Sequence, residues 1–164
     1  MTLRADAQRN LDRLLDVAEE CFGERGLECS IDEIARRAGV GHGTVFRRFA
    51  TKDELVAAVL GRPLAQLTAV ATEAAAADDP WNGFELFLRT AGELYAANLA
   101  LIAGFQRSVG SLETGELMAA VTGLVLRAQR AGVLRRDVSG EDVMKLIPAA
   151  AGYPDVVLDG LRAR

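Results

Sequence analysis

The sequence predicts an all-α protein of about nine helices. Half of its 164 residues are apolar, with many alanines and leucines and few aromatic residues, a composition typical of a helical core. No stretch alternates apolar and polar residues over the length of a strand. In several places, a capping residue stands just before an apolar run with helical spacing. We therefore expect a small N-terminal domain at residues 1–60 and a larger helical domain at residues 61–164.

The first helix is expected at about residues 5–25. Its apolar residues recur every three or four positions, and Gly26 follows its last turn as a helix-ending glycine. The stripe consists of Leu11, Leu14, Leu15, Ala18, Cys21 and Phe22. This face is expected to pack against the helices that follow.

Two short helices joined by a glycine turn are predicted between Ser30 and Leu55. Ser30 can cap the first of them, and Glu33 can return a bond to the Ser30 amide in a capping box. The turn is Gly39-Val40-Gly41, where glycine permits a positive φ. A second helix near residues 43–49 would bury Val45 and Phe49. This arrangement is a helix-turn-helix.

The fourth helix is capped by Thr51, with Glu54 completing a second capping box. Gly61-Arg62-Pro63 is expected to bend or break it, since proline removes a backbone donor. Asp78-Asp79-Pro80 ends this helix and starts a fifth, which we expect to break near Asn98 before a short sixth helix.

Three more helices are expected after Gly110. They lie at about residues 112–131, 139–150 and 155–161, and Ser139 with Asp142 marks the start of the second. The last two are separated by Gly152-Tyr153-Pro154, an abrupt junction for two packed helices.

Charge is distributed unevenly along this acidic chain. The net charge is −4, yet no acidic residue occurs between Ile34 and Lys52, where five basic residues occur. They are Arg36, Arg37, Arg47, Arg48 and Lys52. A local basic face on an acidic body suits a protein that binds DNA at one surface.

At these residues the chain resembles the TetR family of bacterial transcriptional regulators. The resemblance rests on IDEIARRAGVGHGTVFRRFATKDELVAAVL and on the preceding FGERGLE. It implies a DNA-binding head and a helical effector-binding and dimerisation domain. It also implies a homodimer on a double-stranded DNA operator, a repressor that a small, largely apolar ligand releases. We expect no cofactor and no metal.

The resemblance also implies which residues meet DNA. His42 would contact a base or a phosphate, or remain an exposed turn residue, and Lys52 matches a lysine that contacts phosphate. Phe46 replaces a more usual tyrosine, so a packing role is expected for its ring, and Arg48 replaces a frequent histidine. The expected DNA-binding residues are His42, Gly43, Thr44, Phe46, Arg47, Arg48, Lys52 and Arg36.

Ligand and dimer contacts follow from the same resemblance. The expected pocket residues are Trp81, Phe84, Leu88, Tyr95, Leu99, Phe105, Gln106, Met118 and Val121. The expected dimer residues are Val143, Leu146, Ile147, Val156, Val157 and Leu161. In each set, completion of the monomer core is the competing interpretation.

The sequence also bears on three other functions. A single histidine, with no nucleophile elbow, phosphate loop or metal-ligand spacing, argues against an enzyme. An architectural or cell-division DNA-binding protein with the same head stays open. So does a redox switch through Cys21, expected in the core, and Cys29, expected to be partly exposed.

The expected location is the cytoplasm, with no membrane partner. The first residues quickly become charged and amphipathic, unlike a signal peptide. The longest uncharged run, Leu94 to Gln106, is too short to span a bilayer.

Overall fold

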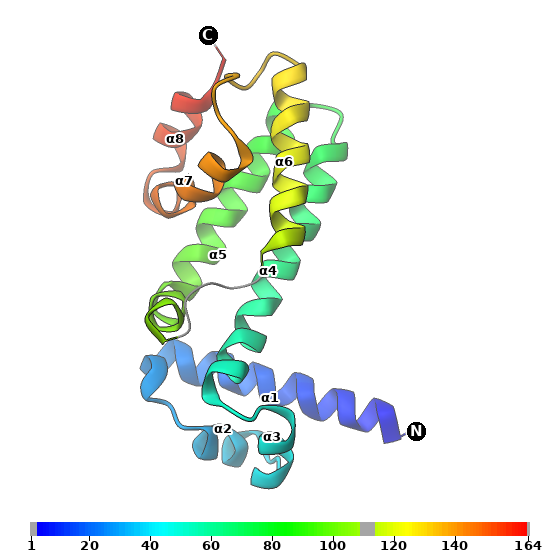
Figure 1. Ribbon diagram of the computed structural model, residues 1–164, viewed down its shortest axis with the longest axis vertical. Helices are drawn as coiled ribbons and strands as arrows, with labels where there is room; N and C mark the ends of the chain where they lie inside the picture. The colour runs from blue at the N-terminus through cyan, green and yellow to red at the C-terminus, as the bar shows by residue number, and fades with distance from the viewer. Residues whose placement is uncertain (1–2, 109–113, 164) are drawn as a thin grey trace. The chain divides into compact units, whose positions relative to one another are not determined.

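The computed structural model describes the backbone of residues 3–108 and 114–163, and the side chains of residues 6–99, 101–103 and 114–163. These residues form eight α-helices and one 3-10 helix, with one isolated β-bridge between Leu134 and Arg162 (Figure 1). The all-α prediction is confirmed. The elements are α1 (Leu3–Arg25), η1 (Gly26–Glu28), α2 (Ile31–Ala38), α3 (His42–Arg48), α4 (Lys52–Ala76), α5 (Pro80–Ser108), α6 (Gly115–Arg130), α7 (Gly140–Gly152) and α8 (Pro154–Leu161).

Backbone contacts divide the chain into two compact units. The first comprises Met1–Arg62 and Asn98–Leu112, and the second comprises Pro63–Ala97 and Glu113–Arg164. Each unit has its own cluster of buried apolar side chains. Helices α4 and α5 therefore each supply residues to both cores.

The break expected near Asn98 is wrong, and of the bend or break expected at Gly61-Arg62-Pro63 the break is wrong. α4 continues through Pro63, and α5 continues through Asn98. In each case buried residues lie on both sides of the expected break, as with Leu60 and Leu67 in α4. Burial on both sides favours continuing the helix, and it outweighs the hydrogen bond that Pro63 removes.

Core packing explains part of the apolar character of α4. By length and composition alone, this helix would be long enough to cross a membrane, but such a helix is equally typical of a soluble core. Its buried residues are divided between the units, with Leu55, Val59 and Leu60 in the first and Leu67 and Ala71 in the second. α4 therefore supplies buried apolar side chains to both cores.

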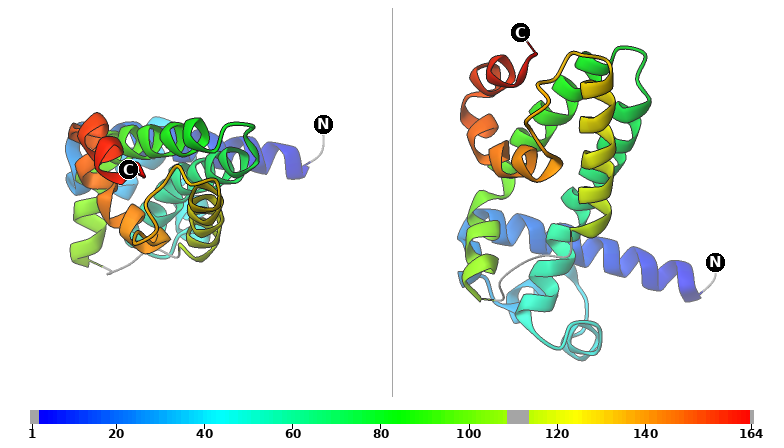
Figure 2. Two further views of the ribbon diagram at one scale, coloured as in Figure 1. Left: turned by 90° about the horizontal axis from the view of Figure 1, so that it is seen from above. Right: turned by 45° about the horizontal axis from the view of Figure 1, so that its top comes forward.

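Capping residues start α5 and α7 of the second unit as predicted. The carboxylate of Asp79 accepts hydrogen bonds from the amides of Trp81 at 2.8 Å and Asn82 at 3.1 Å, which begins α5. Ser139 and Asp142 form a full capping box at the start of α7. Tyr153 alone separates α7 from α8, and the two helices pack side by side (Figures 1 and 2).

Three glycines let backbones of the second unit approach closely. A Cβ at Gly83 of α5 would lie 2.5 Å from the Ala74 carbonyl oxygen of α4, and one at Gly92 would lie 3.0 Å from the Ala150 backbone of α7. At Gly140 it would lie 2.8 Å from Oγ1 of Thr122 on α6. Glycine is therefore required at Gly83, because backbone atoms cannot move aside as a side chain can.

Replacing Gly83 with alanine is expected to destabilise the protein by about 1–3 kcal/mol, because the new methyl group overpacks against the α4 backbone. The matched control is Gly123→Ala in α6, where no atom lies within 4 Å of the added Cβ. There the change should stabilise by about 0.5–1 kcal/mol, since alanine loses less backbone entropy in a helix. Urea denaturation of both variants checks this, and equal stabilities would contradict the close approach.

Candidate DNA-binding site

A single core holds together the helices of the first unit. Phe22 of α1, Ile34 of α2 and Val45 of α3 are each at most 1% exposed, and Phe49 beyond α3 is 6% exposed. Ion pairing adds a contact between α1 and α4, because Nη1 of Arg62 lies 2.6 Å from Oδ1 of Asp16. Burial of Val45 and Phe49 was predicted and is confirmed.

The turn between α2 and α3 closes as the glycines predicted. Gly39 has φ 64°, its amide donates to the carbonyl of Arg36 at 3.2 Å, and the Val40 amide donates to Ala35 at 3.0 Å. These two bonds form a Schellman motif, which requires a residue that tolerates a positive φ. Gly41 then begins α3 with φ −61°, so only the first glycine uses the left-handed region.

The start of α2 differs in part from the prediction. The Ser30 hydroxyl accepts from the Glu33 amide at 3.2 Å, which confirms the cap. The carboxylate of Glu33 instead pairs with Arg25 of α1 at 2.6 Å and with Arg37 at 3.1 Å. Two cations outcompete the Ser30 amide for this carboxylate. The hydrogen bond that Arg37 donates to the Glu24 carboxylate, together with the negative charges of Glu24 and Glu33, raises the pKa of Arg37.

Helix α3 presents a polar and basic face to solvent. Because Val45 points into the core, the residues on either side of it are exposed. These are His42, Gly43, Thr44, Phe46, Arg47 and Arg48, all six of the α3 residues expected at DNA. Arg36 is likewise exposed, on α2.

His42 is held by two neighbours. Its Nδ1 lies 2.5 Å from Oδ1 of Asp32 on α2, and its ring lies 4.4 Å from the ring of Phe46. Phe46 is 40% exposed, so it packs on His42 at the surface, away from the core. Sequence reasoning missed Asp32, since the nine residues between Asp32 and His42 give no signal that the two side chains meet.

The two arginines of α3 lie differently on the surface. Arg47 folds back on its own helix, donating from Nε to the Gly43 carbonyl at 3.1 Å and from Nη2 to the Thr44 hydroxyl at 3.4 Å. Arg48 and Thr44 line an open, mostly apolar groove of about 580 Å³ whose other wall includes Leu11 and Leu14 of α1. Both guanidinium groups lie on the exposed face of α3.

Lys52, at the first position of α4, is half-buried. Its Nζ donates to the carbonyl of Leu27 in η1 and lies 6.0 Å from the centre of the Phe22 ring. The lysine therefore connects α4 to the segment between α1 and α2, a contact that the sequence did not predict.

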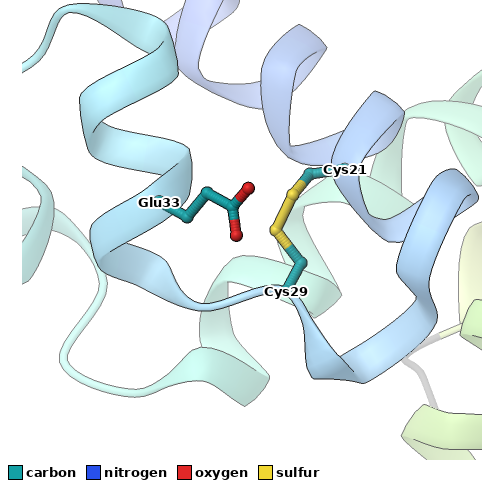
Figure 3. A group of neighbouring side chains, drawn as sticks. All are labelled: Cys21, Cys29 and Glu33. Atoms are coloured by element: carbon teal, nitrogen blue, oxygen red, sulfur yellow. A yellow bond between two sulfur atoms is a disulfide. The ribbon is translucent and has the colours of Figure 1, made fainter.

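Cys21 and Cys29 form a disulfide bond that joins α1 to the residue just before the Ser30 cap (Figure 3). Both side chains are fully buried, so the expected partial exposure of Cys29 is wrong. The two sulfur atoms and a Glu33 carboxylate oxygen lie within 4.8 Å of one another. As a metal site this group is unfavourable, because the sulfurs are bonded to each other and Arg25 and Arg37 neutralise the carboxylate.

The residues predicted to bind a ligand are divided between core and surface. Trp81, Phe84, Leu88 and Val121 lie in the core of the second unit, where Tyr95 and Met118 are partly buried. Leu99 is 49% exposed and belongs to the first unit, while the side chains of Phe105 and Gln106 lie outside the described residues. A shallow groove of about 280 Å³ along Val70, Ala74 and Leu86 contains none of these predicted residues.

The residues predicted at a dimer interface also differ in exposure. Val143, Ile147 and Leu161 are buried in the core of the second unit, and Leu146 and Val157 are partly buried against it. Val156 is 70% exposed, as is its neighbour Tyr153. The most exposed apolar surface of α7 and α8 is therefore at these two residues.

Known proteins match this chain in two ways. Residues 14–59 match the family described as bacterial regulatory proteins, tetR family. Over 66 residues the chain is 47% identical to a helix-turn-helix transcriptional repressor from Mycobacterium tuberculosis, a match covering 40% of this chain and 35% of that protein. The chain thus matches about a third of the length of this relative.

Solved structures match the chain over nearly its whole length. A TetR transcription regulatory protein from Mycobacterium vanbaalenii is 37% identical, with a TM-score of 0.75 and coverage of 99% of this chain and 100% of that one. A gamma-butyrolactone receptor shares the fold, with a TM-score of 0.69 at 18% identity over 96% of this chain and 90% of that one. On the full-length identity to the Mycobacterium vanbaalenii protein, the chain belongs to the TetR family of bacterial transcriptional regulators.

Proposed function

We propose that this regulator is a cytoplasmic repressor whose domain at residues 1–60 reads a double-stranded DNA operator. The supporting observation is the exposed face of α3, where Thr44, Arg47 and Arg48 surround an inward-pointing Val45. A helix presented in this way fits the major groove, where each base pair offers a distinct pattern of donors and acceptors. The domain at residues 61–164 would bind the effector and pair two copies.

Arg47 and Thr44 are proposed to read bases. An arginine can donate two hydrogen bonds to O6 and N7 of guanine, and a threonine can bond a base edge or contact a thymine methyl group. Arg47 would have to leave Gly43 and Thr44, both exposed partners, so the cost of its reorientation is small. The His42 ring, oriented by Asp32 and Phe46, would lie at the start of the same helix.

Lys52 and Arg36 are proposed to bind phosphates. Lys52 stands at the N-terminus of α4, where the helix dipole also favours an anion. Phosphate contacts fix the position of the protein on the duplex and supply much of its affinity.

Two copies are needed because one α3 reads one half-site. High affinity for an operator requires two DNA-binding domains about one helical turn of DNA apart, roughly 34 Å. We propose a homodimer through α7 and α8, with the exposed Tyr153 and Val156 at its centre and Leu146 and Val157 at its edge.

The effector is proposed to be a small, largely apolar molecule bound in the second unit. The partly buried Tyr95 and Met118 would border it, and Trp81 would have to yield some of its core packing. The fold shared with a gamma-butyrolactone receptor supports a ligand of this kind. A ligand that binds the low-affinity state better would shift the population and release the DNA.

The proposed operator can be identified by selection from random duplexes with the full-length protein. We expect enrichment of a two-fold symmetric site whose half-sites are centred about 10 base pairs apart or a multiple of that spacing. Enrichment without symmetry would contradict the dimer, and no enrichment over bulk DNA would contradict sequence-specific reading.

Arg47→Ala is expected to weaken binding to the selected site by about 1–3 kcal/mol and to relax the choice of one base pair, because a bidentate base contact is lost. Titrations on the selected duplex and on duplexes with each half-site position changed will measure both effects. A variant that binds all of these duplexes with the wild-type preferences would remove Arg47 from base reading.

Lys52→Ala is expected to weaken binding equally on selected and scrambled duplexes and to lower the slope of log K against log salt by about one. Arg130→Ala is the matched control, because it removes one positive charge from an exposed site on α6 in the second unit, outside the proposed dimer helices. The control should keep the wild-type slope. Thermal melting of Lys52→Ala separates this effect from the loss of its bond to Leu27, and an unchanged slope would contradict the phosphate contact.

A further inference from the structure

The disulfide bond closes a short loop at a critical place in the DNA-binding unit. Cys21 lies in the last part of α1, and Cys29 stands eight residues later, next to the Ser30 cap of α2 (Figure 3). The chain has no other cysteine. The bond therefore joins the last part of α1 to the residue just before the Ser30 cap of α2.

The loop between the cysteines makes contacts with both flanking parts of the helix-turn-helix. Arg25 pairs with Glu33 of α2 at 2.6 Å, and the Leu27 carbonyl accepts the hydrogen bond from Lys52 of α4. Ser30, adjacent to Cys29, caps α2 through the Glu33 amide. Each of these contacts depends on where the loop holds its backbone.

We propose that Cys21 and Cys29 are a reversible thiol–disulfide modification site that sets the affinity of this regulator for DNA. The inference rests on the proposed function, because it requires the first unit to read DNA in the cytoplasm. Disulfide bonds are rare there, and those that occur are usually transient and redox-sensing. The oxidant is a low-molecular-weight disulfide of the glutathione class.

The bond forms by thiol–disulfide exchange between the two cysteine thiols and one small disulfide. One cysteine thiolate attacks a sulfur of the small disulfide, forming a mixed disulfide and releasing one small thiolate. The second cysteine thiolate then attacks the protein sulfur of the mixed disulfide and releases the second small thiolate. Two protein thiols and one small disulfide thus give one protein disulfide and two small thiols, with both thiolate leaving groups protonated by water.

Access to the sulfur atoms requires local opening, since both cysteines are fully buried. The segment that would open is short. It consists of the three-residue 3-10 helix η1, which begins at Gly26 with φ 57° and ends at the exposed Glu28. Short elements of this kind open at lower free energy than the helices around them.

The oxidised protein is the form with high DNA affinity. With the bond closed, the loop holds the start of α2 and keeps Arg25 and Leu27 in place against α2 and α4. Reduction lets the loop sample other conformations, so binding must order it again and affinity falls.

Three measurements on the oxidised and the reduced wild-type chain test the proposal. In a glutathione redox buffer, mass spectrometry after alkylation should show the pair cycling fully between two thiols and one disulfide. Reduction should lower the melting temperature by about 5–10 °C and speed amide exchange at residues 26–38. Affinity for the selected duplex should fall about fivefold or more.

The control is the double variant Cys21→Ala, Cys29→Ala. Alanine is chosen because a buried serine hydroxyl would lack a partner. Its DNA affinity should resemble that of the reduced wild type and should not respond to the redox buffer. If this variant does not fold, the comparison of oxidised and reduced wild type decides the matter by itself.

The outcomes separate this inference from the proposed function. Equal DNA affinity in both redox states, or a pair that stays reduced or stays oxidised throughout the glutathione buffers, would overturn the switch and leave the regulator intact. Failure of both redox states to bind any selected duplex would overturn the proposed function together with the switch. The switch is supported if reduction weakens DNA binding by the wild type and does not change DNA binding by the alanine variant.

Discussion

Burial of one face of α3 is the constraint on which the DNA-binding unit depends. Val45 and Phe49 enter a core shared with Phe22 and Ile34, and this leaves the other side chains of the short helix in solvent. The same packing therefore stabilises the unit and selects which residues are available to DNA. The positive φ of Gly39 makes it possible, because it turns the chain within two residues.

Most of the charged groups around the exposed face of α3 already have partners within the protein. Glu33 is held by Arg25 and Arg37, His42 lies against Asp32, and Lys52 reaches a backbone carbonyl. The exposed pair of His42 and Asp32 contributes little stability, so exchanging it for a contact with a phosphate or a base costs little, whereas the half-buried Lys52 would have to give up its bond to Leu27. The effect of these contacts is to limit the conformations of the side chains before DNA is bound, and that lowers the entropy lost on binding.

α4 and α5 each run from one unit into the other as a continuous helix. Each runs without a break past the expected interruption, and each supplies buried residues to both cores. A change of packing around Leu67 or Ala71 would thus act on the same helix that begins at Lys52. In the second unit, α4 and α5 approach closely at Gly83, so a ligand inserted between them at this point would have to shift packed helices.

Local signals in the sequence determined where most helices begin, which face of each is buried and where the chain turns. Ser30, Thr51, Asp79 and Ser139 act on amides two or three residues away, so their effect can be predicted from spacing alone. The exposed residues of α3 follow from the same periodicity. Only the tertiary structure decided the continuity of α4 and α5, the Cys21–Cys29 bond, and the contacts of Asp32 with His42 and Lys52 with Leu27. These depend on how elements separated in sequence pack together, and packing energy outweighs local preference at Pro63 and Asn98.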